Sequence, residues 1–477
     1  MNLYLVSIIG YAVLLIGIGW FIGKHVKNAS DFFVGNRQFS WKLLFTTLIA
    51  ANIGAGSTVG VTGLAFKHGV SSWWWIGCSA MGSVLLAYIV GPKIWAIGKK
   101  YNLYTMGDYL DLRYARIFRG ITSSMMVIGT LALFSGQLIG ISWILNVVAA
   151  IDKTTGIIIG ALVVTLYFMA GGILSATIVN IVEVAVIFAG FCLAAPFALN
   201  SIGGWPALEN AVALNLADPA KTEAYFAWDG IGSTTIVGYF LMLVPAFCIS
   251  PGLIGKIYSA ENVRAVKIGT MLNALVQFAF AFLPMILGIC AFAAFPNLGN
   301  AELALPMAMK ELMPFGVSAL ALAAIFAAEV STADSVLFML ATSISKDLYK
   351  TFVRPEATDE ELLKFTRVVT LCCGFAGILL ALMMPNIITA LTIFYSLMTV
   401  SMGAPFLFGL FSERVSVQGA SISAMFGVLT TVGLTFLNDG EGFWILNAAS
   451  TGTLVAAAVM LAGLYVSPNK KIAKGGS

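Results

Sequence analysis

The chain has 477 residues, of which 59% are hydrophobic and only 10% are charged, and its formal net charge is +4. So few charged residues exclude a soluble enzyme of ordinary composition. Uncharged stretches of about 20 residues, long enough to cross a bilayer as a helix, recur along the chain; they are continuous rather than alternating, which disfavours a β-barrel. The composition therefore predicts an all-α membrane protein.

Thirteen membrane-spanning helices are predicted, and the basic residues give them an orientation. In chain order their approximate limits are 3–23, 42–64, 71–97, 121–149, 155–173, 177–199, 235–254, 268–295, 314–344, 368–384, 387–411, 417–437 and 444–466. With the N-terminus outside and the C-terminus cytoplasmic, the lysines and arginines lie on the cytoplasmic side except for Lys67, Lys153, Lys221 and Lys310. This bias satisfies the positive-inside rule for a multi-pass protein of the plasma (inner) membrane. The first span is expected to be a retained helix rather than a cleaved signal.

Two of these spans contain sequences that disfavour a continuous helix. The segment LIAANIGAGSTVG, Leu48 to Gly60, holds three glycines, and PAFCISPGL, Pro245 to Leu253, holds two prolines. Irregular backbone at membrane depth is tolerated only where it lines a cavity or is buried in protein. Breaks in the second and seventh spans suit an inverted repeat, in which paired breaks mark a transporter's binding site. The alternative is tight packing of small residues between helices.

Three acidic residues, Glu183, Glu329 and Asp334, lie well inside predicted spans, and no lysine or arginine is predicted at a comparable depth. A charge at the centre of a membrane helix costs roughly 2.5–3.5 kcal/mol on insertion scales. Each carboxyl group is therefore expected to be protonated, solvated in a cavity or paired with a bound cation.

One face of the ninth span carries oxygen atoms at the helical spacing i, i+3, i+4 and i+7. The residues are Ala328, Ser331, Thr332 and Ser335. Hydroxyl oxygens, together with carbonyl oxygens freed by an unwound neighbour, suit a small hard cation such as sodium. The alternative is that the hydroxyls bond back to carbonyls of their own helix.

Four segments together resemble the solute:sodium symporter family, over about residues 3–436. They are LIAANIGAGS, SDFFVGNR, MAGGILSATIVNIVEV and AAEVSTADSVLFMLATSISKDLYK. The resemblance implies a LeuT-type fold with a 5+5 inverted repeat, an extra N-terminal helix and two C-terminal helices. The expected divisions are residues 1–41 for the extra helix and a cytoplasmic loop, 42–202 and 235–412 for the two repeats, 203–234 for an extracellular loop, and 413–477 for the C-terminal helices and tail.

The resemblance also implies a Na⁺ site between the second and ninth spans. Its ligands are the carbonyl oxygens of Ala50, Ile53 and Ala328 and the hydroxyl oxygens of Ser331 and Thr332. The symporter interpretation would be wrong if these two segments lay too far apart to share a ligand, or if a lysine ammonium were lodged between them.

A second cation site, present in some members of the family, is altered in this sequence. Asn180 stands where those members have an aspartate, and the carboxylate is supplied instead by Asp334, next to Ser331 and Ser335. These four residues either hold a second cation, form a vestigial site or take a proton. Glu183 is expected to be protonated and hydrogen-bonded within the bundle. Glu329 has three open roles: a gate hydrogen bond, a proton site or a position facing a water cavity.

The solute class is suggested by the positions that follow the sodium site. Gly56 and Ser57 stand where sugar-transporting members have glutamate and glutamine, so a sugar is disfavoured. Backbone amides exposed at the terminus of a half-helix suit a carboxylate. The expected solute-lining residues are Gly54, Gly56, Ser57, Trp74, Ser79, Gln137, Phe247, Ser250 and Tyr395.

These features predict a sodium-coupled symporter that imports a small organic solute by alternating access. Its expected partners are sodium, the solute and membrane lipid, without nucleic acid, and it is expected to be a monomer or a weak homo-oligomer. The alternatives are a proton-coupled transporter that uses Glu329 and Asp334, and a sensor that binds the solute without transport. An enzyme is not expected, because the sequence shows no nucleophile–base pair and no metal cluster.

Overall fold

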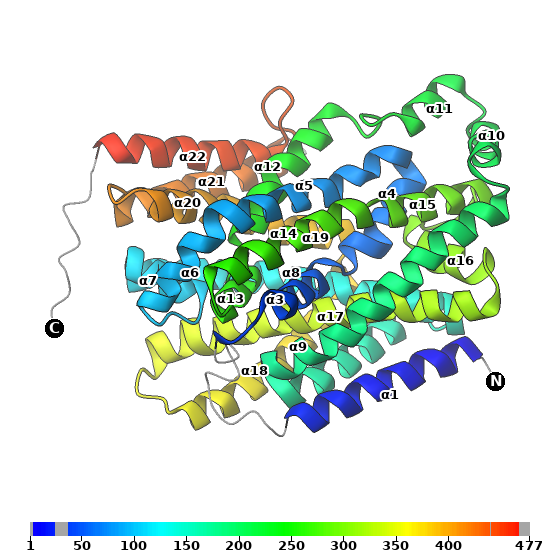
Figure 1. Ribbon diagram of the computed structural model, residues 1–477. Helices are drawn as coiled ribbons and strands as arrows, with labels where there is room; N and C mark the ends of the chain where they lie inside the picture. Colours follow the sequence, from blue (N-terminus) through cyan, green and yellow to red (C-terminus); the bar gives the residue numbers. More distant parts are fainter. Residues whose placement is uncertain (1–2, 24–36, 439, 467–477) are drawn as a thin grey trace.

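The computed structural model describes residues 3–23, 37–438 and 440–466, and these are almost entirely helical. The helices pack as a single bundle, and most of their axes are roughly parallel or antiparallel to one another (Figure 1). Within the described residues, nine helical segments are long and apolar enough to cross a membrane, and three shorter apolar helices accompany them. The all-α membrane fold is as predicted, whereas the number of thirteen spans stays a prediction.

The first half of the chain contains the helices on either side of the first break and those that follow them. They are α1 (Leu3–Gly23), α3 (Trp41–Asn52), η2 (Gly56–Gly60), α4 (Val61–His68), η3 (Gly69–Ser72), α5 (Trp73–Leu85), η4 (Leu86–Val90), α6 (Gly91–Lys100), α7 (Met106–Arg113), α8 (Arg116–Ala149), α9 (Lys153–Ile202), α10 (Trp205–Leu216) and α11 (Pro219–Phe226).

The second half contains the second break and the helix with the buried acids. Its elements are α12 (Ser233–Ile249), α13 (Pro251–Ser259), α14 (Val263–Phe280), α15 (Phe282–Ala294), η5 (Ala301–Leu303), α16 (Ala304–Glu311), α17 (Phe315–Thr342), η6 (Ser343–Val353), α18 (Asp359–Met383), α19 (Ile387–Met398), η7 (Thr399–Gly403), α20 (Ala404–Phe411), α21 (Val417–Leu437) and α22 (Ala448–Val466).

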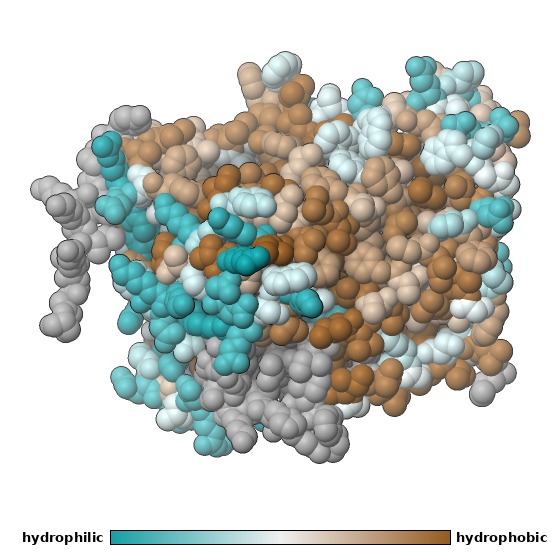
Figure 2. Space-filling view, viewed as in Figure 1, coloured by the Kyte–Doolittle hydropathy of each residue, from teal (hydrophilic) through white to brown (hydrophobic). Residues whose placement is uncertain are grey.

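The bundle has two different ends. One end, here called the basic end, carries α6, α7 and η6, and the opposite end carries α10, α11 and η5 (Figure 1). Polar side chains gather toward the basic end, and apolar surface covers the middle of the same face (Figure 2). α1 begins at the opposite end and α22 finishes at the basic end (Figure 1).

Both predicted breaks are present in the backbone. α3 ends at Asn52, and Ile53 adopts an extended conformation with φ −99° and ψ 92° before η2 begins. α12 ends at Ile249, Ser250 turns the chain with φ −54° and ψ 124°, and α13 starts at Pro251. Proline is favoured there because the first turn of a helix does not use its N–H groups. The two breaks leave carbonyl and amide groups available inside the bundle.

One predicted boundary needs correction. The spans predicted at 155–173 and 177–199 both lie within α9, which is helical from Lys153 to Ile202. No proline separates the two predicted spans, so nothing there forbids helical geometry. The span predicted at 235–254 continues through α13 to Ser259, because the helix restarts after its break.

α17 lies at the centre of the bundle and packs against α9, α8 and α3. Almost every residue from Ala321 to Thr342 is buried, including Glu329 and Asp334. This central position brings the polar residues of α17 next to the break between α3 and η2.

Candidate functional site

A cluster of five oxygen atoms joins the end of α3 to the middle of α17. The hydroxyl oxygen of Ser331 lies 3.1 Å from the carbonyl oxygens of both Ala50 and Ala328. The hydroxyl oxygen of Thr332 lies 3.1 Å from the carbonyl oxygens of Ala50 and Ile53. All five residues are buried. The structure thus brings together the five positions predicted to bind sodium.

The break in α3 frees the carbonyl groups of this cluster. Because α3 ends at Asn52, carbonyl groups in its last turn lack the N–H partner that a longer helix would supply. The side-chain oxygen of Gln137, on α8, accepts a hydrogen bond of 2.9 Å from the N–H of Ala55, which fixes the non-helical segment to α8. A Cβ atom on Gly54 would lie 2.4 Å from the hydroxyl oxygen of Thr332, so only glycine permits this close approach.

The proton count of the cluster favours a cation. Ser331 and Thr332 have one hydroxyl proton each, yet their oxygens make four contacts of 3.1 Å with carbonyl oxygens. Each hydroxyl donates one proton, so the two hydroxyl groups cannot form a full hydrogen bond at all four oxygen–oxygen contacts. A small cation at the centre would be attracted by all five oxygen atoms, and an uncharged oxygen set of this kind suits a hard monovalent ion.

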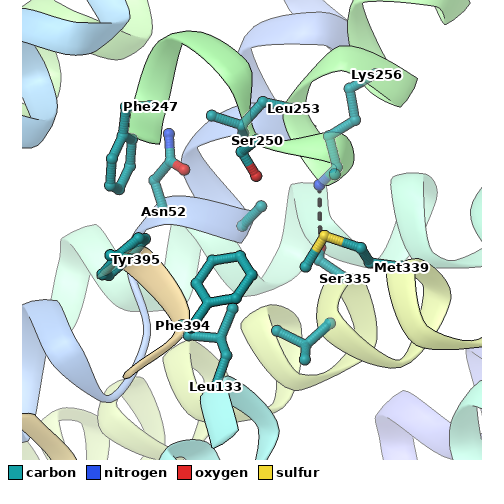
Figure 3. A pocket seen from close by; sticks show the side chains of 13 residues that line it. Asn52, Leu133, Phe247, Ser250, Leu253, Lys256, Ser335, Met339, Phe394 and Tyr395 are labelled. Atoms are coloured by element: carbon teal, nitrogen blue, oxygen red, sulfur yellow. Dashed lines mark hydrogen bonds between the residues drawn. The ribbon is translucent and has the colours of Figure 1, made fainter. Parts of the chain in front are cut away.

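The prediction that no basic residue lies deep in the membrane is wrong, because Lys256 is buried in the bundle. This residue of α13 is only 3% exposed. Its ammonium group donates hydrogen bonds to the carbonyl oxygen of Thr47 at 2.7 Å and to the hydroxyl oxygen of Ser335 at 3.0 Å (Figure 3). It was missed because the predicted span ended two residues before it. The ammonium lies between α3 and α17, but its acceptors are not among the five oxygens of the cluster.

Two of the residues predicted for a second cation site, Asp334 and Ser335, interact with this ammonium group, and a third, Asn180, contacts the neighbouring Thr47. The side-chain amide of Asn180 lies 3.4 Å from the hydroxyl of Thr47, and Ser335 accepts from Lys256. The charges of Lys256 and Asp334 interact electrostatically. Ser331, the fourth residue of the set, belongs instead to the five-oxygen cluster.

Two further buried acids lie near these sites. Glu183, on α9, is fully buried, interacts electrostatically with Asp334, and has no hydrogen-bond partner for its carboxyl group among the described residues. Glu329 lies 2.9 Å from the hydroxyl of Thr58 in η2. Of the three roles open to Glu329, the structure supplies the hydrogen bond that links α17 to the segment beyond the break.

A small cavity lies between the two breaks, next to Lys256 (Figure 3). It is lined by Ala51, Asn52, Leu133, Phe247, Ser250, Gly252, Leu253, Lys256, Ser335, Val336, Met339, Phe394 and Tyr395. Its volume of about 40 Å³ holds a few water molecules and no metabolite. A solute can therefore bind here only when the surrounding helices move apart.

Three of the predicted solute residues, Phe247, Ser250 and Tyr395, line this cavity, and the other six do not. Gly54 and Gln137 lie beside the five-oxygen cluster, and Gly56 packs against Leu391 of α19. Tight packing of small residues, the alternative named above, therefore describes Gly56.

The remaining three predicted residues make local contacts elsewhere. The hydroxyl of Ser57 donates to the carbonyl oxygen of Asn52, and the hydroxyl of Ser79 contacts Gln277. The indole N–H of Trp74 donates to the carbonyl oxygen of Trp228. The sequence analysis missed Asn52 and Lys256, although both lie within six residues of a break.

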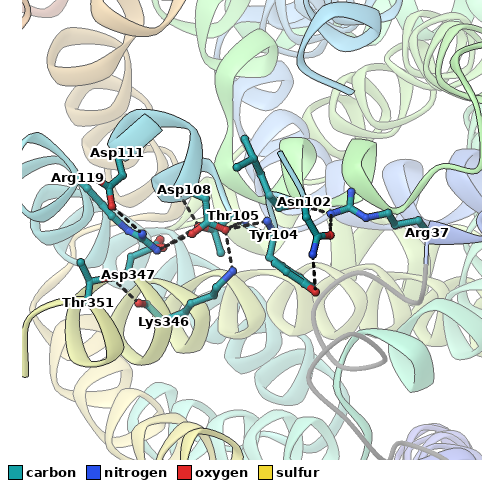
Figure 4. Close-up of polar contacts among 11 residues, drawn as sticks. Arg37, Asn102, Tyr104, Thr105, Asp108, Asp111, Arg119, Lys346, Asp347 and Thr351 are labelled. Carbon is teal, nitrogen blue, oxygen red and sulfur yellow. Dashed lines mark hydrogen bonds and ion pairs between the residues drawn. The ribbon is translucent and has the colours of Figure 1, made fainter. Parts of the chain in front are cut away.

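A network of charged side chains closes the basic end of the bundle (Figure 4). Arg119 of α8 contacts Asp108 of α7 at 2.8 Å and Asp347 of η6 at 2.6 Å, and Lys346 contacts Asp108 at 2.7 Å. Burial alone raises the pKa of Asp108, but Lys346 and Arg119 outweigh it and hold that pKa below its usual range. The network ties α7, α8 and η6 together.

At the opposite end, Glu302 joins three elements. Its carboxylate oxygens accept hydrogen bonds from the indole N–H of Trp143 at 2.7 Å and from the backbone N–H of Ile387 at 2.6 Å. Burial raises the pKa of Glu302, and these two donors offset only part of the rise. Glu302 caps the start of α19 and fixes it to α8.

Comparisons with known proteins agree with this architecture. The chain matches the model of the sodium:solute symporter family over residues 32–427. It is 26% identical over 449 residues to the sodium/pantothenate symporter of Escherichia coli (strain K12), covering 91% of this chain and 92% of that protein. It is 24% identical over 476 residues to the sodium/glucose cotransporter of Vibrio parahaemolyticus, covering 90% and 84%.

A solved structure is also similar over nearly the whole chain. It is a Na⁺-coupled sialic acid symporter in a substrate-bound outward-open state, with a TM-score of 0.82 at 18% identity and 98% of both chains covered. The fold and the relatives define a multi-pass transporter of LeuT-type fold rather than an enzyme. The chain belongs to the sodium:solute symporter family, and sodium is its coupling ion. The predicted family, fold and coupling ion are thereby confirmed.

Proposed function

We propose that the chain imports a small organic solute together with sodium by alternating access, and that the five-oxygen cluster binds the sodium ion. The observation that supports this site is the set of four 3.1 Å contacts in which two hydroxyl groups face three carbonyl oxygens. A bound cation ties the broken helix α3 to α17. It therefore favours the conformation in which the two segments are close, because a ligand shifts an equilibrium through its differential affinity for the two states.

In this proposal the basic end faces the cytoplasm of a cell whose inner membrane holds the protein. The positive-inside rule supports this orientation. Sodium then enters from the opposite end, and the membrane potential contributes about 2.3 kcal/mol per charge per 100 mV to import.

We further propose that the solute bears a carboxylate group. The observation that supports this class is the charge of the cavity: Lys256 lines it, and none of its lining residues among the described part of the chain is acidic. The N-terminus of α13 also faces the cavity through Gly252 and adds partial positive charge. Phe247 and Tyr395, with ring centroids 5.6 Å apart, supply an apolar wall.

A thermal-shift screen tests both parts of the proposal on purified protein. Sodium chloride is compared with choline chloride, and each carboxylate in the screen is paired with its amide and with sugars of similar size. A ligand that binds only the native state raises the melting temperature. We expect carboxylates to do so in sodium, and the matched amides and sugars to have no effect.

Compounds that stabilise the protein are then followed as radiolabelled solutes in proteoliposomes. Uptake driven by an inward sodium gradient is the expected result. Uptake in sodium-free buffer driven by an inward proton gradient would indicate proton coupling instead, and binding without uptake would indicate a sensor.

A further inference from the structure

The buried ammonium group of Lys256 occupies a position that resembles that of a bound ion. It is held by the carbonyl oxygen of Thr47 on α3 and the hydroxyl oxygen of Ser335 on α17. These two helices are the same pair that supplies the five-oxygen cluster. Like the proposed sodium ion, the ammonium connects a backbone oxygen of the broken helix with a hydroxyl of the central helix.

The two positions are related by a shift of one helical turn. Thr47 lies three residues before Ala50 on α3, and Ser335 lies four residues after Ser331 on α17. In α3 the chain runs from the basic end toward the break, and in α17 it runs toward the basic end. Both shifts therefore point toward the basic end. Lys256 thus forms a second cationic bridge one turn nearer to the basic end than the sodium cluster.

Polar side chains of the kind that a free cation would use lie near the ammonium. Asn180, on α9, is 1% exposed, and its amide nitrogen lies 3.4 Å from the hydroxyl of Thr47, whose carbonyl oxygen binds Lys256. The amide oxygen of Asn180 has no hydrogen-bond partner among the described residues. Asp334 supplies the negative charge that interacts with Lys256, and Glu183 is the other acid nearby.

We propose that the ammonium group of Lys256 is a resident cation that takes the place of a second sodium ion, so that the protein binds one sodium per chain. A lysine ammonium and a sodium ion cannot share the same two oxygens, because both carry a positive charge and need the same lone pairs. The lysine is covalently attached to α13, so its charge stays with the protein throughout the cycle. This inference rests on the proposed sodium symport and adds its stoichiometry.

Equilibrium binding of radioactive ²²Na⁺ to the purified full-length protein tests the inference without knowledge of the solute. We expect one sodium ion per chain in the wild type. We expect two in Lys256→Gln, because the substitution removes the ammonium and leaves the charge of Asp334, the oxygens of Thr47 and Ser335 and a new amide oxygen. Lys310→Gln is the matched control, since Lys310 also donates to a backbone carbonyl, that of Val147, but does so next to the opposite end. It should bind one sodium ion.

The outcomes separate this inference from the proposed function. Two sodium ions bound to the wild type, or one bound to a folded Lys256→Gln protein, would overturn the resident-cation assignment and leave the sodium site intact. No sodium bound to the wild type would overturn the sodium site itself. If Lys256→Gln does not fold, the wild-type stoichiometry still decides, and the double variant Lys256→Gln/Asp334→Asn, which removes both charges, should bind one ion.

Discussion

The hydroxyl oxygen of Thr332 lies 3.1 Å from the carbonyl oxygen of Ile53, across the gap between the central helix and a helix that has just ended. Removing this hydroxyl together with that of Ser331 should abolish high-affinity sodium binding. A polar contact with a charged group contributes about 1.5–3 kcal/mol to the binding free energy. The double variant Ser331→Ala/Thr332→Ala, which loses two such contacts, should therefore lose at least about 100-fold in sodium affinity. Binding of ²²Na⁺ measures the loss.

The conservative variant Thr332→Ser is the control for that experiment. It keeps the hydroxyl oxygen and removes only a methyl group, so sodium affinity should stay within about tenfold of the wild type. Wild-type sodium affinity in the folded double alanine variant would show that the ion binds elsewhere.

A methyl group at Gly54 should disturb the same cluster by contact rather than by loss of a ligand. The Cβ atom of Gly54→Ala would lie 2.4 Å from the Thr332 hydroxyl and 2.7 Å from the side-chain oxygen of Gln137. We expect sodium-driven uptake to fall by at least about tenfold, which corresponds to about 1.4 kcal/mol.

Gly255→Ala is the matched substitution, because an added Cβ atom there meets no atom within 4 Å. Alanine is also the better helix former, by about 0.5–1 kcal/mol, so uptake should be unchanged and the melting temperature should not fall. Equal uptake by the two variants would contradict the close approach at Gly54.

Glu302 should make stability depend on pH at the opposite end of the bundle. Its pKa is higher in the folded protein than in the unfolded chain because the carboxyl group is buried. The folded state therefore holds the proton more tightly. The contribution of Glu302 to stability should be greatest below the unfolded value of about 4.3 and should be lost as pH rises through the raised folded value.

Melting temperatures measured at successive pH values check this prediction, and in Glu302→Gln that part of the fall should disappear. Glu209→Gln is the control, because Glu209 also accepts an indole N–H at 2.7 Å, from Trp205, but does so at an exposed position. An unchanged pH dependence in Glu302→Gln would contradict the assignment.

Asp108 should have the opposite pH dependence at the basic end. Lys346 and Arg119 hold its pKa below the usual range despite burial, so its contribution to stability is present above about pH 3.9 and is lost as pH falls through the lowered value. Asp108→Asn leaves Lys346 without its contact of 2.7 Å. Breaking a buried ion pair costs about 3–5 kcal/mol, so the melting temperature at neutral pH should fall by several degrees.

Asp111→Asn offers a matched comparison, because Asp111 contacts the same Arg119 at 3.4 Å and its side chain is 32% exposed. The expected loss is small, as for most exposed ion pairs. Equal losses in the two variants would argue against a closed network around Asp108.

The breaks and the hydroxyl face of α17 could be predicted from the residues themselves, since both depend on local chemistry, whereas the pairing with the carbonyl groups of Ala50 and Ile53 was implied by the family resemblance. Glycines and prolines interrupt a helix wherever they occur, and the spacing of Ser331 and Thr332 puts both hydroxyls on one face. Lys256 was misplaced because hydropathy ends a span at the first charge, whereas the restarted helix α13 carries that charge into the protein. Six of the predicted solute residues do not line the cavity. Gly54, Gly56 and Ser57 belong to the unwound segment, where side-chain directions follow no helical period, and the other three lie on the regular helices α5 and α8. The inverted repeat itself stays a prediction.

α17 continues into η6 at Thr342 without a break, so one helical rod carries both the hydroxyls of the ion cluster and the charged residues Lys346 and Asp347. Ser331 and Asp347 are 16 residues apart, which corresponds to roughly 24 Å of helix at 1.5 Å per residue. In the proposed transport cycle, a tilt of this rod would move the five-oxygen cluster and the salt bridges of Lys346 and Asp347 together. Release of sodium and rearrangement of the basic end are therefore expected to be coupled.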